Sequence, residues 1–102
     1  MALPERLRSL FWDCEFAALD DSRDRDFVVG RILASGTWDN IRWARRYYGD
    51  GVIREWIMRH RGRSLTGPQV RFWEVLVELP GEEVTAWLRS PERRIWEGSG
   101  AA

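Results

Sequence analysis

The sequence predicts an all-α fold, a compact orthogonal bundle of four to six short helices with a helix-turn-helix-like central pair. Three observations indicate this fold: helix caps and helix stops alternate along the chain, apolar residues recur at helical spacing, and no convincing pair of alternating strands is found. With 102 residues, the chain is expected to form one domain over residues 1–97, followed by a flexible tail at 98–102.

The first two helices are expected in "DDSRDRDFVVGRILASG" (20–36) and "TWDNIRWARRYYG" (37–49). In the first, Asp21 or Ser22 is the predicted N-cap and Gly36 is the predicted stop. In the second, Thr37 is the predicted N-cap and Gly49 is the predicted stop. Polar caps and terminal glycines are typical of helix ends, so these boundaries depend only on local chemistry.

Two further helices are expected in "DGVIREWIMRHRG" (50–62) and "LTGPQVRFWEVLVELPG" (65–81). The second of these starts at Thr66, tolerates Pro68 in its first turn and ends before Pro80. A weaker helix is expected in "GEEVTAWLRS" (81–90), and "PERRIWEG" (91–98) could add a turn or two.

The apolar arcs of these helices are broad for so short a chain. The helices at 37–49 and 65–81 each have an apolar arc of about 220° on a helical wheel, and the helix at 20–36 is similarly broad. A chain of this length cannot wrap all three, so part of this surface is expected to meet a partner or a second copy. The alternative is that "LFWD" (10–13) and the last helices cover everything.

The formal net charge is zero, but the charges are unevenly distributed. Residues 1–41 carry five arginines and eight acids (minus three), residues 42–71 carry eight arginines and two acids (plus six), and residues 72–102 carry three arginines and six acids (minus three). All of these basic side chains are arginine, which binds carboxylates or phosphates through two parallel hydrogen bonds. The basic centre could therefore meet either group.

Signatures of enzymes are close to absent from the sequence, and no cofactor is expected. The only cysteine and histidine, Cys14 and His60, lie far apart, and His60 falls on an otherwise apolar helix face, which favours a packed histidine. Asp24 and Asp26 do not face each other on a helix and lack a third ligand, so no metal site is expected. The single cysteine, the lack of a membrane-spanning run and the lack of a secretory signal favour a cytoplasmic protein.

The helix–glycine–helix pattern at 37–61 matches the general layout of a helix-turn-helix. Its second helix and the residues after it would present four arginines to nucleic acid: Arg54, Arg59, Arg61 and Arg63. These side chains would neutralise phosphates, but few polar side chains are placed to read base edges. A DNA-binding repressor is therefore the alternative function.

The chain also resembles a group of small bacterial proteins. The resemblance rests on "LFWD" (10–13), "GTWDNIRWARRYYGDGVIREW" (36–56) and "RSLTGPQVRFW" (63–73), and spans about residues 10–80. Members of this group usually have a proline directly after the Ser/Thr, whereas Thr66 is followed here by Gly67 and then Pro68. Such proteins are often encoded beside nucleotidyltransferase toxins of the AbiEii or MenT kind, and the group has no catalytic residues to transfer.

The resemblance implies a non-enzymatic antitoxin or accessory protein that binds a nucleotidyltransferase-type toxin. The aromatic candidates for partner contact are Trp43, Tyr47, Phe72 and Trp73, with Arg42, Arg45 and Arg46 at the rim. By charge complementarity, these arginines could pair with the acidic residues that bind the metal ion in the active site of such a toxin, in place of the nucleotide. A third possibility is a self-associating structural module, which would form a homo-oligomer without another partner.

Overall fold

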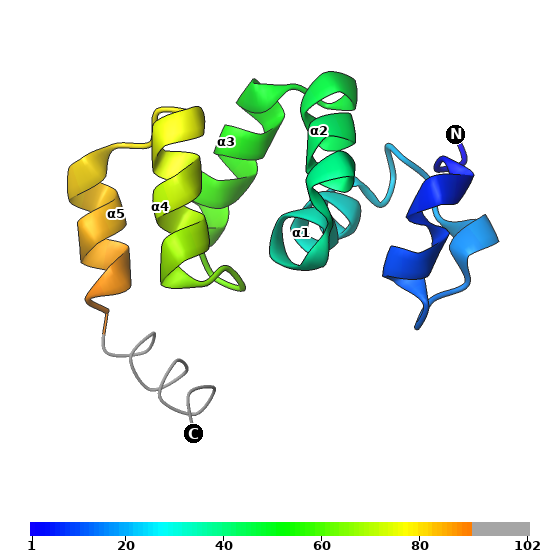
Figure 1. Cartoon of the computed structure of the whole chain (residues 1–102), viewed down its shortest axis with the longest axis horizontal. Helices are drawn as coiled ribbons and strands as arrows, with labels where there is room; N and C mark the ends of the chain where they lie inside the picture. Colours follow the sequence, from blue (N-terminus) through cyan, green and yellow to red (C-terminus); the bar gives the residue numbers. More distant parts are fainter. Residues whose placement is uncertain (91–102) are drawn as a thin grey trace. The chain divides into compact units, whose positions relative to one another are not determined.

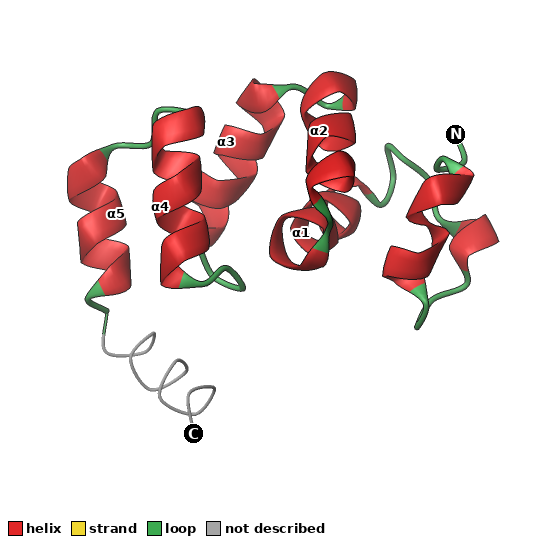
Figure 2. Cartoon of the chain, viewed as in Figure 1, coloured by secondary structure: helices red, strands yellow, loops and turns green. Residues whose placement is uncertain are grey.

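The structure is a computed structural model that describes residues 1–90, and every regular element in this range is a helix (Figures 1 and 2). The chain divides into two compact units, Met1–Gly49 and Asp50–Ala102. The predicted all-α class with several short helices is confirmed. The single domain over 1–97 stays a prediction, and the tail at 98–102 and the extra turn at 91–98 lie outside the described residues.

The first unit contains two 3₁₀ segments, η1 (Glu5–Phe11) and η2 (Phe16–Ala18), followed by helices α1 (Arg25–Ser35) and α2 (Trp38–Tyr47). Helix α1 contacts both η1 and α2. An isolated antiparallel bridge joins Ala2 to Asp20. The buried apolar side chains of this unit come from the amino-terminal segment and both helices: Leu3, Leu7, Phe11, Phe16, Val28, Val29, Ile32, Leu33 and Ala44.

Helix α1 begins later than the sequence suggested. The predicted caps, Asp21 and Ser22, are wrong, because the helix starts at Arg25 and neither side chain caps it. The Asp20 carboxylate instead accepts the backbone N–H groups of Ser22 (3.0 Å) and Arg23 (2.8 Å), which holds residues 20–23 in a turn. At the other end, the predicted stop at Gly36 is confirmed.

Helix α2 begins as predicted at Thr37. The Thr37 hydroxyl accepts the N–H of Asn40 at 3.3 Å, and the Asn40 side chain accepts the N–H of Thr37 at 3.0 Å, which forms a reciprocal capping box. The chain leaves the helix through Gly49, whose φ of 92° is readily adopted only by glycine. Both predicted boundaries of this helix are confirmed.

The second unit contains helices α3 (Asp50–His60), α4 (Gly67–Leu76) and α5 (Gly81–Leu88), and α4 packs against α5 (Figure 1). Thr66 and Gln69 form a second capping box at the start of α4, with Pro68 in the first turn as predicted. Helix α4 ends at Leu76, short of Pro80, and Glu78 follows with a positive φ. The buried apolar side chains are Ile53, Trp56, Ile57, Leu65, Val70, Trp73, Val77, Leu79 and Val84.

Candidate docking surface on helix α2

Three aromatic rings meet on α2 and at its carboxyl end. The Trp43 and Tyr47 rings are stacked, with centroids 4.9 Å apart and planes 10° apart. The Tyr48 ring stands edge-on to both, at 5.7 Å from Trp43 and 5.1 Å from Tyr47. Offset-stacked and edge-to-face pairs are the favourable arrangements of aromatic rings, so this trio stabilises its own geometry.

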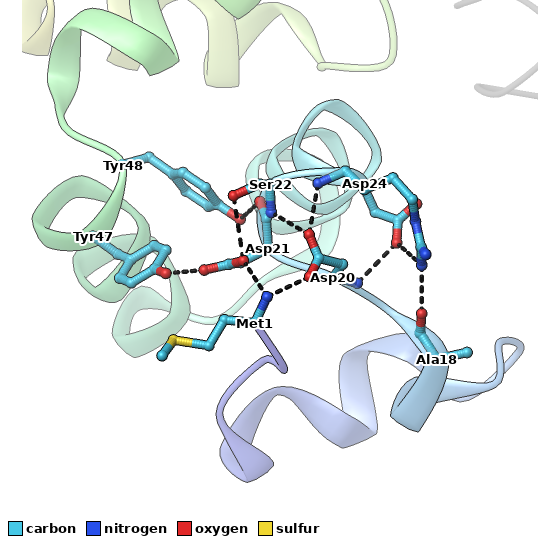
Figure 3. A network of polar contacts seen from close by, with 9 residues as sticks. Met1, Ala18, Asp20, Asp21, Ser22, Asp24, Tyr47 and Tyr48 are labelled. Atoms are coloured by element: carbon cyan, nitrogen blue, oxygen red, sulfur yellow. Dashed lines mark hydrogen bonds and ion pairs between the residues drawn. The ribbon is translucent and has the colours of Figure 1, made fainter.

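Asp21 holds two of these rings in place from the turn before α1. The Tyr47 hydroxyl donates a hydrogen bond to the Asp21 carboxylate, and the Tyr48 hydroxyl donates to the Asp21 carbonyl oxygen at 2.9 Å (Figure 3). Asp21 is only 6% exposed. Its two tyrosine partners lie 26 and 27 residues further along the sequence. A buried carboxylate therefore fixes the carboxyl end of α2 to the start of the unit.

The Met1 amine completes this network by pairing with the carboxylates of Asp20 and, at 3.0 Å, Asp21 (Figure 3). The hydrogen bond from Tyr47, followed by the amine, lowers the pKa of Asp21. The same hydrogen bond raises the pKa of Tyr47, and burial raises the pKa of Tyr48 to about 12. At neutral pH, Asp21 is therefore ionised and both phenols are protonated, which is the state that these hydrogen bonds require.

The inner side of α2 is narrow. Asn40 and Ala44 are its only buried residues, while Trp43 and Tyr48 are half-buried. Trp38 and Tyr47 are each 49% exposed. The broad apolar arc predicted for this helix is thus only partly covered, and the rings of Trp38 and Tyr47 are partly exposed to solvent.

The exposed side of α2 also carries arginines. Arg42 and Arg46 are exposed one turn apart, and Arg45 is half-buried. The Arg42 guanidinium pairs with the Asp39 carboxylate at 2.7 Å, so the outer side of α2 carries both signs of charge. We call Trp38, Trp43 and Tyr47, with Arg42, Arg45 and Arg46, the α2 surface.

The other two predicted aromatic contact residues are in the second unit. Phe72 and Trp73 belong to α4, whereas the α2 surface belongs to the first unit. The Trp73 ring is 1% exposed and forms part of the core, and its role as a partner contact stays a prediction. Phe72 is partly exposed and packs edge-on against Trp73, at 5.4 Å.

The four arginines predicted for nucleic-acid binding are all exposed in the second unit: Arg54, Arg59, Arg61 and Arg63. Helices α2 and α3 both form on either side of Gly49, as the helix-turn-helix pattern requires, but they belong to different units. Their pairing as a helix-turn-helix therefore stays a prediction.

The residues of "LFWD" have separate roles that the sequence did not reveal. Phe11 is buried, the Leu10 carbonyl accepts a hydrogen bond from Arg31 at 3.0 Å, and the Asp13 carboxylate pairs with the same guanidinium. Trp12, in contrast, is 82% exposed. The motif drew attention to residues 10–13, but nothing in the sequence predicted that Arg31 would contact them.

The other residues considered for catalysis or metal binding, His60, Cys14 and Asp24, contact neighbouring residues of the fold. The His60 ring stacks on Trp56 with centroids 4.0 Å apart, and its Nδ1 lies 2.8 Å from the Trp56 carbonyl oxygen, so this half-buried ring packs against its own helix. Burial, and then the neighbouring Asp13 carboxylate, raises the pKa of the Cys14 thiol, which opposes nucleophilic reactivity. Asp24 accepts hydrogen bonds from the Asp20 N–H and from Arg23.

Within residues 1–90, no group of three or more His, Cys, Asp or Glu side chains is placed to hold a metal ion. None of the helices described in this range combines the length and the apolar character that crossing a membrane requires.

The chain was compared with protein families, curated proteins and solved structures. No curated protein and no solved structure matches it. One family does: residues 7–57, half of the chain, match a family of unknown function, DUF6922. The matched segment contains "LFWD", α1, the whole α2 surface and most of α3. The chain therefore belongs to the family of unknown function DUF6922.

Proposed function

We propose that this chain is a non-enzymatic protein-binding module and that the α2 surface is where its partner docks. The observation that carries the proposal is the fixed geometry of one exposed ring: Tyr47 is half-exposed, yet it is stacked on Trp43 and hydrogen-bonded to the buried Asp21. Side chains that are ordered before binding lose little conformational entropy when a partner covers them.

The composition of the α2 surface supports protein recognition. Tryptophan, tyrosine and arginine are the residue types that most often dominate the free energy of protein–protein binding. Trp38 and Tyr47 supply the exposed rings, and the arginines supply the rim. The mixed charges, with Asp39 beside Arg42, suit a protein partner better than a polyphosphate.

The partner that we propose is a nucleotidyltransferase-type toxin, which makes this chain a cytoplasmic antitoxin or accessory protein. This part of the proposal rests on the resemblance carried by residues 10–80. Charge complementarity adds one detail: Arg42, Arg45 and Arg46 would meet carboxylates of the toxin, including those that hold its catalytic metal.

The first test measures binding of the purified full chain to a nucleotidyltransferase toxin of the AbiEii or MenT kind, by calorimetry at moderate salt. Trp38→Ala and Tyr47→Ala should each weaken binding at least about fivefold, since such anchors contribute more than about 1 kcal/mol. Val75→Ala is the matched control, because Val75 is an exposed apolar residue of α4 in the second unit. If the Trp38→Ala/Tyr47→Ala double variant bound the toxin with wild-type affinity, the proposal that the toxin docks on the α2 surface would be refuted.

A second test separates the contribution of the arginine charges to binding from that of the aromatic rings. Reversal of Arg42, Arg45 and Arg46 to glutamate should weaken binding, and unchanged affinity would remove the proposed contact with toxin carboxylates. Light scattering of the chain alone tests the self-associating alternative. A stable homo-oligomer that the Trp38→Ala/Tyr47→Ala variant dissociates would assign the same surface to a second copy.

A further inference from the structure

The second unit carries a concentrated positive charge that the proposed function does not use. Residues 54–63 contain four arginines and one acid, Glu55. Three of the arginines, Arg59, Arg61 and Arg63, lie at the end of α3 and in the turn that follows it. We call residues 59–63 the arginine loop.

Buried residues hold the arginine loop in place. Exposed Arg61 and Arg63 flank the buried Gly62, and Leu65 is fully buried two residues further on. A Cβ on Gly62 would lie 3.0 Å from Val70 Cγ2 and 3.6 Å from the Trp87 ring, so the loop backbone fits tightly against α4 and α5. The arginine side chains therefore project from a backbone whose position is fixed by the core.

Backbone hydrogen bonds fix the conformation of the loop as well. The Gly62 N–H donates to the Ile57 carbonyl at 3.1 Å, the Arg63 N–H donates to the His60 carbonyl at 3.0 Å, and the Leu65 N–H donates to the Gly62 carbonyl at 3.2 Å. Arg61, with φ of 54°, and Gly62, with φ of 69°, both adopt the left-handed conformation. An arginine in this conformation is uncommon, because its Cβ is crowded by the backbone.

A purely structural role does not account for the whole cluster. Cations near the carboxyl end of a helix complement its dipole, and this explains Arg59 and Arg61. The effect is confined to the last turn of a helix, whereas Arg54 lies in the middle of α3 and Arg63 lies beyond its end. The exposed positive charge therefore extends further than the helix end requires.

We infer that the arginine loop, together with Arg54, binds the phosphate backbone of double-stranded DNA without reading its sequence. Arginines neutralise phosphates and release counterions, which needs no contact with base edges. Single-strand binding uses exposed aromatic rings as stacking platforms, and the loop has none, since His60 is stacked on Trp56. This inference is independent of the proposed docking of a protein on α2.

The test measures fluorescence anisotropy of a short labelled DNA duplex of arbitrary sequence with the full chain, from low to moderate salt. Four phosphate contacts predict that log K falls against log salt with a slope of about −3 to −4. Arg61→Ala and Arg63→Ala should each reduce this slope by about 1 and weaken binding at low salt. Arg6→Ala is the matched control, because Arg6 is an exposed arginine of the first unit.

Several results would overturn the inference. They are absence of salt-dependent binding to the duplex, unchanged binding of a triple Arg59→Ala/Arg61→Ala/Arg63→Ala variant that circular dichroism shows to be folded, and an equal loss in Arg6→Ala. Tighter binding of a single strand or of an RNA duplex would reject duplex DNA as the ligand. Equal competition by poly-glutamate of matched charge would assign the loop to an acidic protein instead.

Discussion

Arg31 donates two hydrogen bonds to the Asp13 carboxylate, at 2.8 and 3.0 Å, although eighteen residues separate the two in sequence. The guanidinium also lies over the rings of Phe11 and Phe27, at 5.6 and 5.1 Å from their centroids, and donates to the Leu10 carbonyl. One arginine of α1 thus ties the amino-terminal segment to the helix that contacts α2.

This pair predicts a specific response to acid. The Arg31 guanidinium lowers the pKa of Asp13 to about 2, from an ordinary value near 4. A carboxylate whose pKa is lowered by folding stabilises the protein above its unfolded pKa, and this contribution is lost as pH falls from about 4 to about 2. Asp13→Asn should therefore flatten the fall in melting temperature over this interval.

The control for this prediction is Asp39→Asn, which removes a carboxylate from the exposed ion pair with Arg42. Exposed pairs contribute little to stability, so this variant should keep the wild-type pH profile. Identical profiles for Asp13→Asn and the wild type would show that the Arg31–Asp13 pair does not stabilise the folded chain.

Tyr48 predicts a response at the alkaline end. Burial raises its pKa to about 12, so the folded state holds this phenolic proton more tightly than the unfolded state does. The stabilisation is complete below pH 10, the ordinary pKa of tyrosine, and is lost as pH rises towards 12. Tyr48→Phe should remove this alkaline loss, and ultraviolet absorbance should show Tyr48 ionising well above free tyrosine.

The same variant tests the anchor on Asp21. Tyr48→Phe deletes the 2.9 Å hydrogen bond to the Asp21 carbonyl and should cost about 1 kcal/mol of unfolding free energy at neutral pH. Denaturant unfolding measures this cost. A variant as stable as the wild type, with an unchanged alkaline profile, would contradict the role given to this hydrogen bond.

Replacing glycine by alanine should change the stability in opposite directions at two positions of the second unit. Gly62→Ala should destabilise by about 1 to 3 kcal/mol, because φ is positive and the new methyl group would press on Val70. Gly51→Ala, in α3, meets nothing within 4 Å and should stabilise by about 0.5 kcal/mol through helix propensity. Chemical denaturation of both variants measures the difference, and effects of the same sign would refute the geometry given for Gly62.

The cap of α2 predicts a loss that a hydroxyl should restore. Thr37→Ala removes the acceptor for the Asn40 N–H and should cost about 1 kcal/mol, whereas Thr37→Ser keeps the hydroxyl and should recover most of it. Thr66→Ala, in the equivalent box before α4, provides an independent repeat. If Thr37→Ser were as destabilising as Thr37→Ala, the capping hydrogen bond would not be the cause.

The helix boundaries that could be predicted are those decided by neighbouring residues. The cap and stop residues interact only within one helical turn of their own position, so their roles can be predicted from the sequence. These residues are Thr37, Thr66, Gly36 and Gly49. The predicted start of α1 is wrong because an aspartate such as Asp21 looks like a suitable N-cap from the local sequence alone. Its carboxylate is instead used by Tyr47, 26 residues away, and no local pattern reveals such a partner.

The candidate surfaces show the same division. Helical spacing predicted that α2 carries more aromatic side chains than it can bury, and the exposure of Trp38 and Tyr47 agrees with this. Spacing could not separate Phe72 from its neighbour Trp73, because the direction of burial on α4 depends on where α5 packs. The exposure of Trp12 inside an otherwise structural motif is likewise a property of the folded unit.

The anchoring of Tyr47 on Asp21 also bears on the speed of recognition. A partner that arrives at α2 meets a ring whose orientation was fixed during folding, so no slow rearrangement of this surface has to precede the final contacts. Complex formation should then follow a single exponential whose rate rises linearly with partner concentration. Loosening the ring by Asp21→Ala, which removes the acceptor of the Tyr47 hydroxyl, would add a slower, concentration-independent phase to the association.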